Sequence, residues 1–393
     1  MSAVGGGPAP LAGVRVLDLT RLIPGALATR KLADLGAEVV KVEEPGRGDY
    51  LRNIPPLIGG EGLMHRVLNR GKKSVALDYR TEEGRATLDR LALAADVLVE
   101  VSRPGRLAEF GIDLADLRRR HPRLVVCSVT AYGQTGPLAT LPAHGMNVDA
   151  YAGWVTTEAH DGRDRIAAGI FTSVAVELGG INAALGILAA LHQARTTGQG
   201  AWIDASCWDA AVEATRLRLA HIAATGADLF DVRELGPLYD MYRTADGHLV
   251  LLGALEQKFW EAFCRAIDRP DLAGRWRGGA AAVQFEDDAT ARAELTAIFA
   301  TRTAAQWSDL FVTWAVPGAE ILHPAEVLGH PQFAARGLID DDGRAGDDPV
   351  PAILDPLRWI DDDARPGTGG PPSPALGQHT GEVLAGWLDA VPA

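Results

Sequence analysis

The sequence predicts an α/β protein, with a Rossmann-like large domain built on a parallel sheet and a smaller α+β domain. Up to about residue 130, short apolar strands alternate with helical segments. From about residue 173, a long stretch rich in Ala, Leu and Ile predicts a helix that is buried on nearly all sides. After residue 226 the pattern changes to a hairpin followed by helices. With 47% hydrophobic and 23% charged residues, the chain has the composition of an ordinary globular protein.

Five strands are expected in the first part of the chain, each a short apolar run. They span residues 14–19, 38–42, 74–78, 96–100 and 124–129. Helices are expected between them, at residues 25–35, 81–95, 107–110 and 114–120. The segment that begins at Thr81 continues with two glutamates, which favour the positive end of a helix dipole. This alternation is typical of βαβ units, and therefore of a parallel sheet.

The remaining elements complete two domains. They are a long helix at 173–194, a strand at 202–205, a helix at 208–224, a hairpin at 239–252, helices at 257–267, 290–301 and 304–312, and a last helix at 380–388. Residues 226–236 are typical of a linker, and the tail from His330 is acidic and rich in Pro and Gly. We therefore expect residues 1–225 to form the first part of the large domain and 226–325 the small one. Residues 326–393 should return onto the large domain.

Composition argues against several classes of function. The formal net charge of −13 disfavours nucleic acid or an anionic membrane as the main partner. No N-terminal targeting signal is evident, and no apolar run is expected to span a bilayer, so the cytoplasm is the expected location. The three cysteines lack CxxC or zinc-site spacing, so we expect reduced, buried thiols and no metal site.

Ligands of open α/β sheets lie beyond the carboxyl ends of the strands. This rule selects the loops at 20–25, 43–50, 78–80, 102–106 and 131–145, several of which carry arginine. The first loop lacks both the GxGxxG pattern of dinucleotide-binding folds and the GKS or GKT ending of a phosphate-binding loop. A nicotinamide cofactor is therefore not predicted, and the function must be argued from other residues.

A series of short motifs runs in a fixed order through nearly the whole chain. They are LAGVRVLDL from Leu11, LGAEVVKVE from Leu35, NRGKKSV from Asn69, RPG from Arg103, YGQTGP from Tyr132, GILAAL from Gly186, TGQG from Thr197 and LGQHTGE from Leu376. Together they resemble the class III CoA-transferase family (CaiB/BaiF type). The resemblance implies a large domain formed by both chain ends and an interlocked homodimer, with the active site between the large domain of one subunit and the small domain of the other. Coenzyme A is then expected only as part of an acyl-CoA thioester substrate, with no permanently bound cofactor.

Two segments resemble the α-methylacyl-CoA racemase branch of this family. His144 lies in AHGMN and Glu256 in GALEQKFW. Removing the proton next to a thioester needs a base with a suitable pKa, and a histidine with its ordinary value of ~6.5 qualifies. Glu256, from the second domain, would orient the imidazole. By residue type alone, His144 is better explained as an ordinary loop histidine, and Glu256 is equally well explained as an acid at a helix start. The resemblance favours the catalytic interpretation of both.

The family's catalytic aspartate has no counterpart at its expected position. In the family it lies just before or at the start of the long helix that ends in GILAAL, which here is Ala175 or Val176. No aspartate occurs between Arg165 and Asp204. Glu177 is the nearest carboxylate and matches only if the helix start slips by one or two residues. The favoured alternative for Glu177 is a helix residue that faces solvent or a polar partner.

The resemblance also implies which residues bind the CoA moiety. The expected cofactor-binding residues are Leu22, Ile23, Arg47, Leu77, Tyr79, Arg80, Val101, Ser102, Arg103, Ala143, Gly145, Met146 and Asn147. Lys72, Lys73 and Arg106 are further basic candidates for holding phosphates, although a solvated surface is the usual place for such residues. Glu44 stands where the family often has a basic residue, which weakens the expected contact with the adenine end.

Four hypotheses follow, in order of preference. The first is an acyl-CoA enzyme of the racemase type with His144 as the base, and the second is a class III CoA-transferase that moves CoA between carboxylic acids. The third is a CoA-binding protein without catalytic activity, and the fourth is a family member with other chemistry on a carrier-bound acyl group. Residues 145–175 and the hairpin should shape the acyl pocket, but their mostly apolar chemistry does not identify the acyl group.

Overall fold

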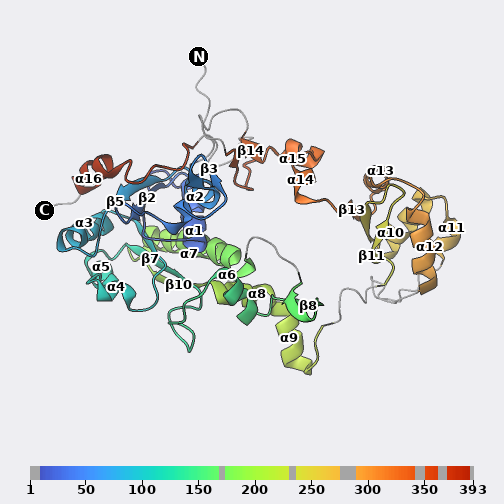
Figure 1. The fold of residues 1–393 in the computed structure, drawn as a ribbon, viewed down its shortest axis with the longest axis horizontal. Coiled ribbons are helices and arrows are strands. Elements are labelled where there is room, and N and C mark those ends of the chain that lie inside the picture. Colours follow the sequence, from blue (N-terminus) through green and yellow to red (C-terminus); the bar gives the residue numbers. More distant parts are fainter. Residues whose placement is uncertain are drawn as a thin grey trace, which may run out of the picture. The chain divides into compact units, whose positions relative to one another are not determined.

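The computed structural model describes residues 9–167, 173–229, 236–274, 289–340, 350–361 and 370–389 (Figure 1). The chain divides into two compact units, and the smaller one, residues 217–335, is inserted between residues 1–216 and 336–393 of the larger. The larger unit ends where helix α9 (Arg216–Thr225) begins, whereas the sequence placed the boundary after this helix. No described residue of α9 is buried, so this helix adds nothing to the core of the larger unit.

A six-stranded sheet of parallel strands forms the centre of the larger unit, in the order β10-β7-β6-β1-β2-β5. The strands are β1 (Arg15–Asp18), β2 (Glu38–Glu43), β5 (Lys73–Ala76), β6 (Val97–Glu100), β7 (Val125–Thr130) and β10 (Trp202–Ser206). The α/β class and the parallel sheet expected from the sequence are thereby confirmed. The strand order reverses between β1 and β6, and ligands of doubly wound folds bind beyond the carboxyl ends of the strands at such a point.

Helices cover both faces of this sheet, because alternate residues of each strand point to opposite sides. In β1, Val16 belongs to one core and Leu17 to the other. The first core is covered by α1 (Ile23–Asp34), α6 (Gly145–Tyr151), α7 (Val174–Thr197) and α8 (Cys207–Ala214). The second is covered by α3 (Glu82–Leu93), α4 (Arg106–Glu109), α5 (Leu114–Arg120) and α16 (Thr380–Leu388).

Helix α7 has 24 residues and a strongly apolar composition, which suits either a membrane span or a buried core helix. Its packing distinguishes the two. By length and composition it could cross a membrane, contrary to the expectation that no apolar run would do so. Half of its most apolar window is nevertheless buried inside the protein, where it packs on α1, α8 and β7. The approach to α1 is close, since a Cβ on Gly180 would lie 2.7 Å from the carbonyl oxygen of Pro24. These contacts are those of a core helix.

Several short elements between the strands were not predicted. Between β2 and β5 lie η1 (Tyr50–Arg52), β3 (Leu57–Ile58), β4 (Glu61–Gly62) and α2 (Leu63–Asn69). After α6, an exposed hairpin is formed by β8 (Thr157–His160) and β9 (Arg163–Ile166). Near the C-terminus, β14 (Ile339–Asp340) pairs with β15 (Ala352–Ile353) in a two-stranded antiparallel sheet. Of these elements, η1 and α2 matter most below, because they carry residues of the candidate site.

The C-terminal segment lies along β5, the strand at one edge of the sheet. The Ser74 amide donates to Nδ1 of His379 (3.2 Å), and the His379 amide donates to the Ser74 carbonyl oxygen (2.9 Å). The Ala76 amide donates to Oγ1 of Thr380 (3.1 Å), and the Gly377 amide to Oγ of Ser74 (2.9 Å). Unpaired strand edges promote aggregation, so this segment protects an edge that would otherwise be open.

The smaller unit has its own sheet and its own core. The antiparallel strands β11 (Tyr239–Arg243), β12 (Leu249–Gly253) and β13 (Gly318–Glu320) are accompanied by α10 (Gln257–Ala266), α11 (Pro270–Ala273), α12 (Ala289–Phe299), α13 (Ala304–Trp314), α14 (Pro324–Val327) and α15 (Pro331–Arg336). Aromatic rings fill the core, with the centroids of Phe299 and Trp307 4.6 Å apart. The hairpin and the helices expected near 257, 290 and 304 are present. Glu256 is the partly buried N-cap residue of α10.

Candidate functional site

A cavity of about 710 Å³ lies in the larger unit at the carboxyl ends of β1, β6 and β7. The described residues that line it are Arg21, Leu22, Ile23, Pro24, Tyr50, Leu51, Ile54, Met64, Val101, Arg103, Val129, Thr130, Ala131, Ala139, Leu141, Pro142, Ala143, His144, Gly145, Val148, Val176 and Cys207. Its volume is within the range of ~300–1,000 Å³ that is usual for small-molecule sites. The cavity therefore occupies the place where a doubly wound fold binds its ligand.

The cavity contains about half of the residues that the resemblance selected. Those that line it are Leu22, Ile23, Val101, Arg103, Ala143, His144 and Gly145. Those that do not are Arg47, Leu77, Tyr79, Arg80, Ser102, Met146, Asn147 and Glu177. Leu77 and Tyr79 instead pack against the core on the other face of the sheet, and Ser102 lines a separate hollow of about 130 Å³. Arg47 and Met146 are exposed.

The basic residues expected to hold phosphates have several different environments. Lys72 is completely buried, so the suggestion that it grips a ligand is wrong. Arg80 lies between Asp78 (2.7 Å) and Glu44 (2.8 Å), and Arg106 pairs with Glu109. Lys73 pairs with Glu38 and Glu382.

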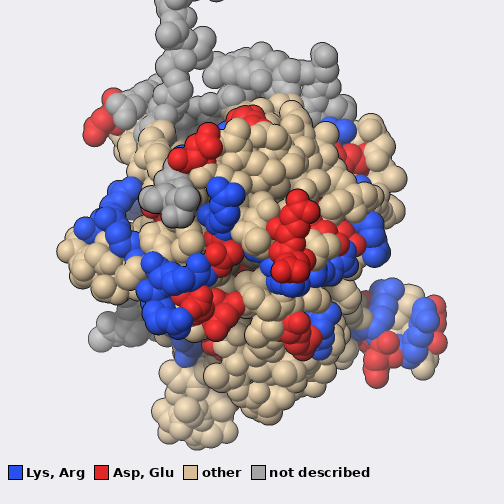
Figure 2. Space-filling model, turned by 90° about the vertical axis from the view of Figure 1, so that its left-hand side faces the viewer, with Lys and Arg blue, Asp and Glu red and all other residues tan. Residues whose placement is uncertain are grey.

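Figure 2 shows one face of the molecule on which positive and negative side chains are interleaved rather than gathered into a patch of one sign. Among the described residues that line the cavity, Arg21 and Arg103 are the two with a guanidinium group. Among the described contacts, both guanidinium groups bond to neutral oxygens, Arg103 to the carbonyl of Thr140 (3.1 Å) and Arg21 to the hydroxyl of Tyr79 (3.3 Å).

His144 is exposed and stands at the start of α6, where its side chain lines the cavity. Its backbone amide donates to Oδ1 of Asn147 (2.9 Å), one turn further along the helix. The side chain of Asn147 thus fixes the backbone at His144. The next residue, Gly145, comes very close to the start of α7. A Cβ at this position would lie 2.4 Å from Cβ of Ser173 and 3.1 Å from Cγ2 of Val176.

Gly145→Ala is expected to destabilise the protein by about 1–3 kcal/mol, because the added methyl group forces the starts of α6 and α7 apart. Urea unfolding followed by circular dichroism measures the effect. Gly386→Ala is the matched control, since a Cβ there meets nothing within 4 Å and alanine is the better helix former in α16. Equal midpoints for Gly145→Ala and the wild type would contradict the prediction.

The two positions at which the resemblance places the family's aspartate, Ala175 and Val176, lie in the first turn of α7. Val176 lines the cavity, whereas Ala175 is fully buried and its amide donates to Oδ1 of Asp149 (2.8 Å). Glu177 does not line the cavity. It lies partly buried near Lys31 and Arg30 of α1, where burial raises its pKa. No Asp or Glu is among the described residues of the cavity wall.

Parts of the wall were missed from the sequence. Tyr50, Leu51 and Ile54 come from η1 and the turn after it, which follow a glycine-rich loop without a strand or helix pattern. Cys207 lines the cavity at the start of α8, and burial raises the pKa of its thiol to about 12, so it stays protonated at neutral pH. The sequence feature that could have indicated these wall residues is their place after a strand, since η1 follows β2 and α8 follows β10 at the carboxyl ends of the strands.

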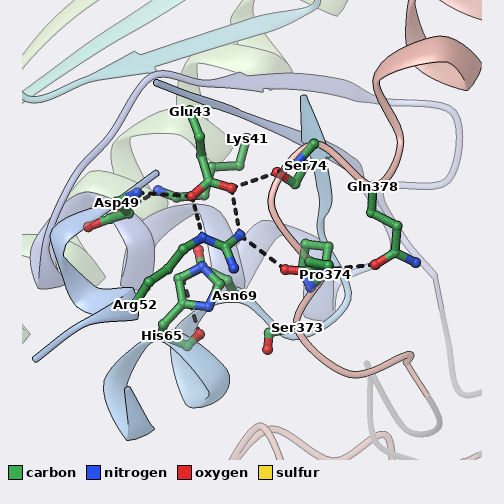
Figure 3. A network of polar contacts seen from close by, with 12 residues as sticks. Lys41, Glu43, Asp49, Arg52, His65, Asn69, Ser74, Ser373, Pro374 and Gln378 are labelled. Carbon is green, nitrogen blue, oxygen red and sulfur yellow. Dashed lines mark hydrogen bonds and ion pairs between the residues drawn. The ribbon is translucent and has the colours of Figure 1, made fainter. Parts of the chain in front are cut away.

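Behind the cavity wall lies a network of buried charges (Figure 3). Lys41, fully buried, forms an ion pair with Asp49 (2.9 Å) and donates to the carbonyl oxygen of Thr20 (2.8 Å). Glu43 accepts from Nε and Nη2 of Arg52 (2.8 and 2.7 Å) and from Oγ of Ser74 (2.6 Å). Arg52 also donates to the Pro374 carbonyl oxygen (3.0 Å), which ties this network to the C-terminal segment.

A second group of buried charges surrounds Asp18, next to the first. Asp18 accepts from Oγ1 of Thr29 (2.7 Å) and from Nζ of Lys72 (3.1 Å). Burial by itself raises the pKa of Asp18, but Lys41 and Lys72 outweigh this effect and lower it to about 2. Burial likewise opposes the ionised form of Glu43, and the hydrogen bonds and charge of Arg52 lower its pKa to about 2.

The protein is expected to lose stability as the pH falls from about 4 to 2. The pKa values of Asp18 and Glu43 are lower in the folded state than the ordinary values of 3.8 and 4.5. The unfolded chain therefore binds protons first, and the stabilisation that is present above these ordinary values disappears as the pH approaches 2. Thermal unfolding at several pH values checks this. A midpoint as steeply dependent on pH in Glu43→Gln as in the wild type would show that Glu43 contributes nothing.

The predicted partnership of His144 with Glu256 stays a prediction, because the two residues belong to different units. Within its own unit, Glu256 begins α10, and the Phe259 and Trp260 amides donate to its carbonyl oxygen (3.0 and 3.1 Å). These backbone contacts define a helix start and leave the role of the carboxylate open.

Comparisons with known proteins extend over almost the whole chain. The model of CoA-transferase family III matches residues 11–380. The acetyl-CoA:oxalate CoA-transferase of Acetobacter aceti is 33% identical, over 85% of this chain and 86% of that protein. The human succinyl-CoA:glutarate CoA-transferase is 31% identical, over 95% and 85% of the two chains. A crystal structure of a Mycobacterium tuberculosis protein superposes with a TM-score of 0.80 at 31% identity and covers 96% of this chain and 99% of its own. The two named relatives favour CoA transfer over the racemase-type reaction that we expected first.

Proposed function

Because this chain belongs to CoA-transferase family III, we propose that it transfers CoA from an acyl-CoA thioester to a carboxylic acid. The observation that carries the proposal is the cavity of about 710 Å³ at the switch point of the sheet. It gathers segments expected to hold CoA from three separate parts of the sequence, around Leu22, Val101 and Ala143. Its wall is mostly apolar, which suits the acyl group, and Arg21 and Arg103 supply positive charge for the anionic groups of the acyl-CoA and of the acceptor acid.

We propose that the acceptor acid itself is the nucleophile of this transfer, because no described residue of the cavity wall is a carboxylate. Its oxygen attacks the thioester carbon, the carbon–sulfur bond breaks, and CoA leaves as a thiolate, so that a mixed anhydride of the two acids remains. The thiolate then attacks the acceptor's carbonyl carbon, and the donor acid leaves as a carboxylate. No atom is lost and no further reactant is needed, but donor and acceptor must be bound together.

The test uses the donors and acceptors named for the relatives. The enzyme is incubated with acetyl-CoA or succinyl-CoA and with oxalate or glutarate, and new CoA thioesters are separated by chromatography. We expect a product with at least one pair, and exchange of labelled CoA into the donor only when an acceptor acid is present. Exchange without an acceptor would contradict the direct attack. No product with any donor and acid would contradict the proposed function.

Arg103→Met is expected to raise the KM for the acyl-CoA donor by about 10- to 150-fold, because one charge-assisted hydrogen bond to the substrate is worth roughly 1.5–3 kcal/mol. Arg106→Met is the matched control. Arg106 lies three residues further on, outside the cavity, and pairs with Glu109. Equal KM values for the two variants would show that Arg103 does not hold the substrate.

A second candidate function is proton transfer next to the thioester carbonyl, with His144 as the base. The observation that favours it is that His144 lines the same cavity. In deuterated water, a 2-methylacyl-CoA should then gain deuterium at the α-carbon, and His144→Ala should slow this uptake by about 10²–10⁴-fold. A wild-type enzyme that transfers CoA but incorporates no deuterium rejects this candidate and leaves the first one standing.

A further inference from the structure

One residue of the cavity wall has a backbone conformation that side chains rarely adopt. Leu22, the N-cap residue of α1, has φ 60° and ψ −160°. This region of the backbone map is essentially restricted to glycine, because a Cβ crowds the neighbouring peptide groups. Strained residues of this kind persist only where surrounding contacts hold them, and they concentrate at functional sites.

The contact that holds Leu22 comes from Asp49. Oδ1 of Asp49 accepts the Leu22 amide (3.3 Å) and also the Leu51 amide (3.0 Å). The same carboxylate forms the ion pair with Lys41, whose ammonium group also holds the carbonyl oxygen of Thr20. One buried carboxylate thus joins the loop after β1 to η1, and both segments line the cavity.

The identity of residue 22 explains why such a restraint is needed. The Leu22 side chain lines the cavity and packs with a small cluster that contains Leu51, Ile54 and Met64. A glycine would adopt the observed backbone angles without help, but it would remove this part of the wall. A leucine supplies the wall only if other contacts offset its backbone strain.

We propose that Asp49 is a positioning residue of this cavity: backed by Lys41, it holds Leu22 in a conformation natural only to glycine and so fixes the wall built from the loop after β1 and η1. The proposal rests on the proposed function only in taking the cavity as the site that binds CoA. Asp49 does not line the cavity itself, so it acts through Leu22 and Leu51.

A double-mutant cycle tests the proposal with the full-length wild type, Asp49→Asn, Leu22→Gly and the double variant. The affinity for CoA is measured by calorimetry, and the thermal midpoint without ligand by circular dichroism. Asp49→Asn should raise the Kd for CoA about tenfold when residue 22 is leucine, and less than threefold when it is glycine, which needs no restraint. The fall in the thermal midpoint should also be smaller in the glycine background.

Asp355→Asn is the matched control. Asp355 is also a buried carboxylate that pairs with a lysine, Lys31 (2.8 Å), and accepts a backbone amide, that of Leu357 (2.9 Å), but it lies outside the cavity. Its replacement should lower the thermal midpoint and leave the Kd for CoA within twofold of the wild-type value.

Each outcome decides the proposal. Equal effects of Asp49→Asn in the two backgrounds would overturn it, since Asp49 would then act independently of the strain at Leu22. If the wild type binds no CoA, the proposed function fails. The thermal midpoints of the four proteins then decide by themselves whether Asp49 restrains Leu22. If Asp49→Asn does not fold, Leu22→Gly is compared with Leu22→Ala, which keeps the strain. A higher midpoint for the glycine variant supports the strain, and a higher midpoint for the alanine variant overturns it.

Discussion

Val176→Asp should raise the exchange of labelled CoA into acetyl-CoA, in the absence of any acceptor acid, by at least about 100-fold. The substitution places a carboxylate on the cavity wall in the first turn of α7, where the helix dipole favours a negative charge. This carboxylate can attack the thioester carbon and release CoA thiolate, a step for which the described wall residues of the wild type offer no carboxylate. Labelled CoA then returns on the acyl group, and the exchange is followed by mass spectrometry.

Two variants separate this effect from a change in shape. Val176→Asn has nearly the shape of the aspartate variant but no nucleophile, so it should show no exchange above the wild-type level. Ala175→Asp would place its carboxylate in the core next to Asp149, because Ala175 is fully buried, and should destabilise the protein without creating activity. A Val176→Asp variant that binds CoA but exchanges it no faster than Val176→Asn would contradict the prediction.

Lys72→Met is expected to lower the free energy of unfolding by about 3–5 kcal/mol, because it leaves a buried carboxylate without its partner. The ammonium group of Lys72 contacts Asp18 (3.1 Å), Oγ1 of Thr29 (2.7 Å) and Oδ1 of Asn69 (2.9 Å), and its side chain is fully buried. Burial lowers the pKa of Lys72 to about 8, against the opposite effect of Asp18. Urea unfolding at pH 7 measures the loss.

The same substitution at the next residue is the control. Lys73 pairs with Glu38 and Glu382, but its side chain is 31% exposed. Solvent screens such pairs, so Lys73→Met should change the stability by less than about 1 kcal/mol. Similar losses for the two variants would show that the buried pair between Lys72 and Asp18 is no stronger than a surface pair.

The sequence predicts the sheet well, because a strand that is buried on both faces leaves a continuous apolar run, as in residues 124–129. It also predicts that the loop carrying His144 belongs to the site, since that loop follows β7 at its carboxyl end. Lys72 and Lys73 show where this reasoning fails. A basic pair suggests a surface, but successive residues at the start of a strand point in opposite directions, and one of these lysines enters the core.

The wall formed by Tyr50, Leu51 and Ile54 could not have been predicted, because it depends on η1 and on the position of Asp49, which accepts amides from two segments far apart in the sequence. The sequence narrowed the position equivalent to the family's aspartate to Ala175 or Val176, and only the structure distinguishes them, because Val176 lines the cavity and Ala175 does not. Patterns of single residues identify elements, whereas the cavity is a property of their packing.

The C-terminal cover of β5 also has a consequence for synthesis on the ribosome. The Gly377 amide that bonds to Ser74 lies 303 residues further along the chain. At ~5–20 residues per second, translation takes roughly 15–60 s to cover this distance. During that interval the edge of β5 is unpaired in the nascent sheet. A truncated or stalled chain would therefore expose an aggregation-prone strand that the C-terminal segment covers in the finished protein.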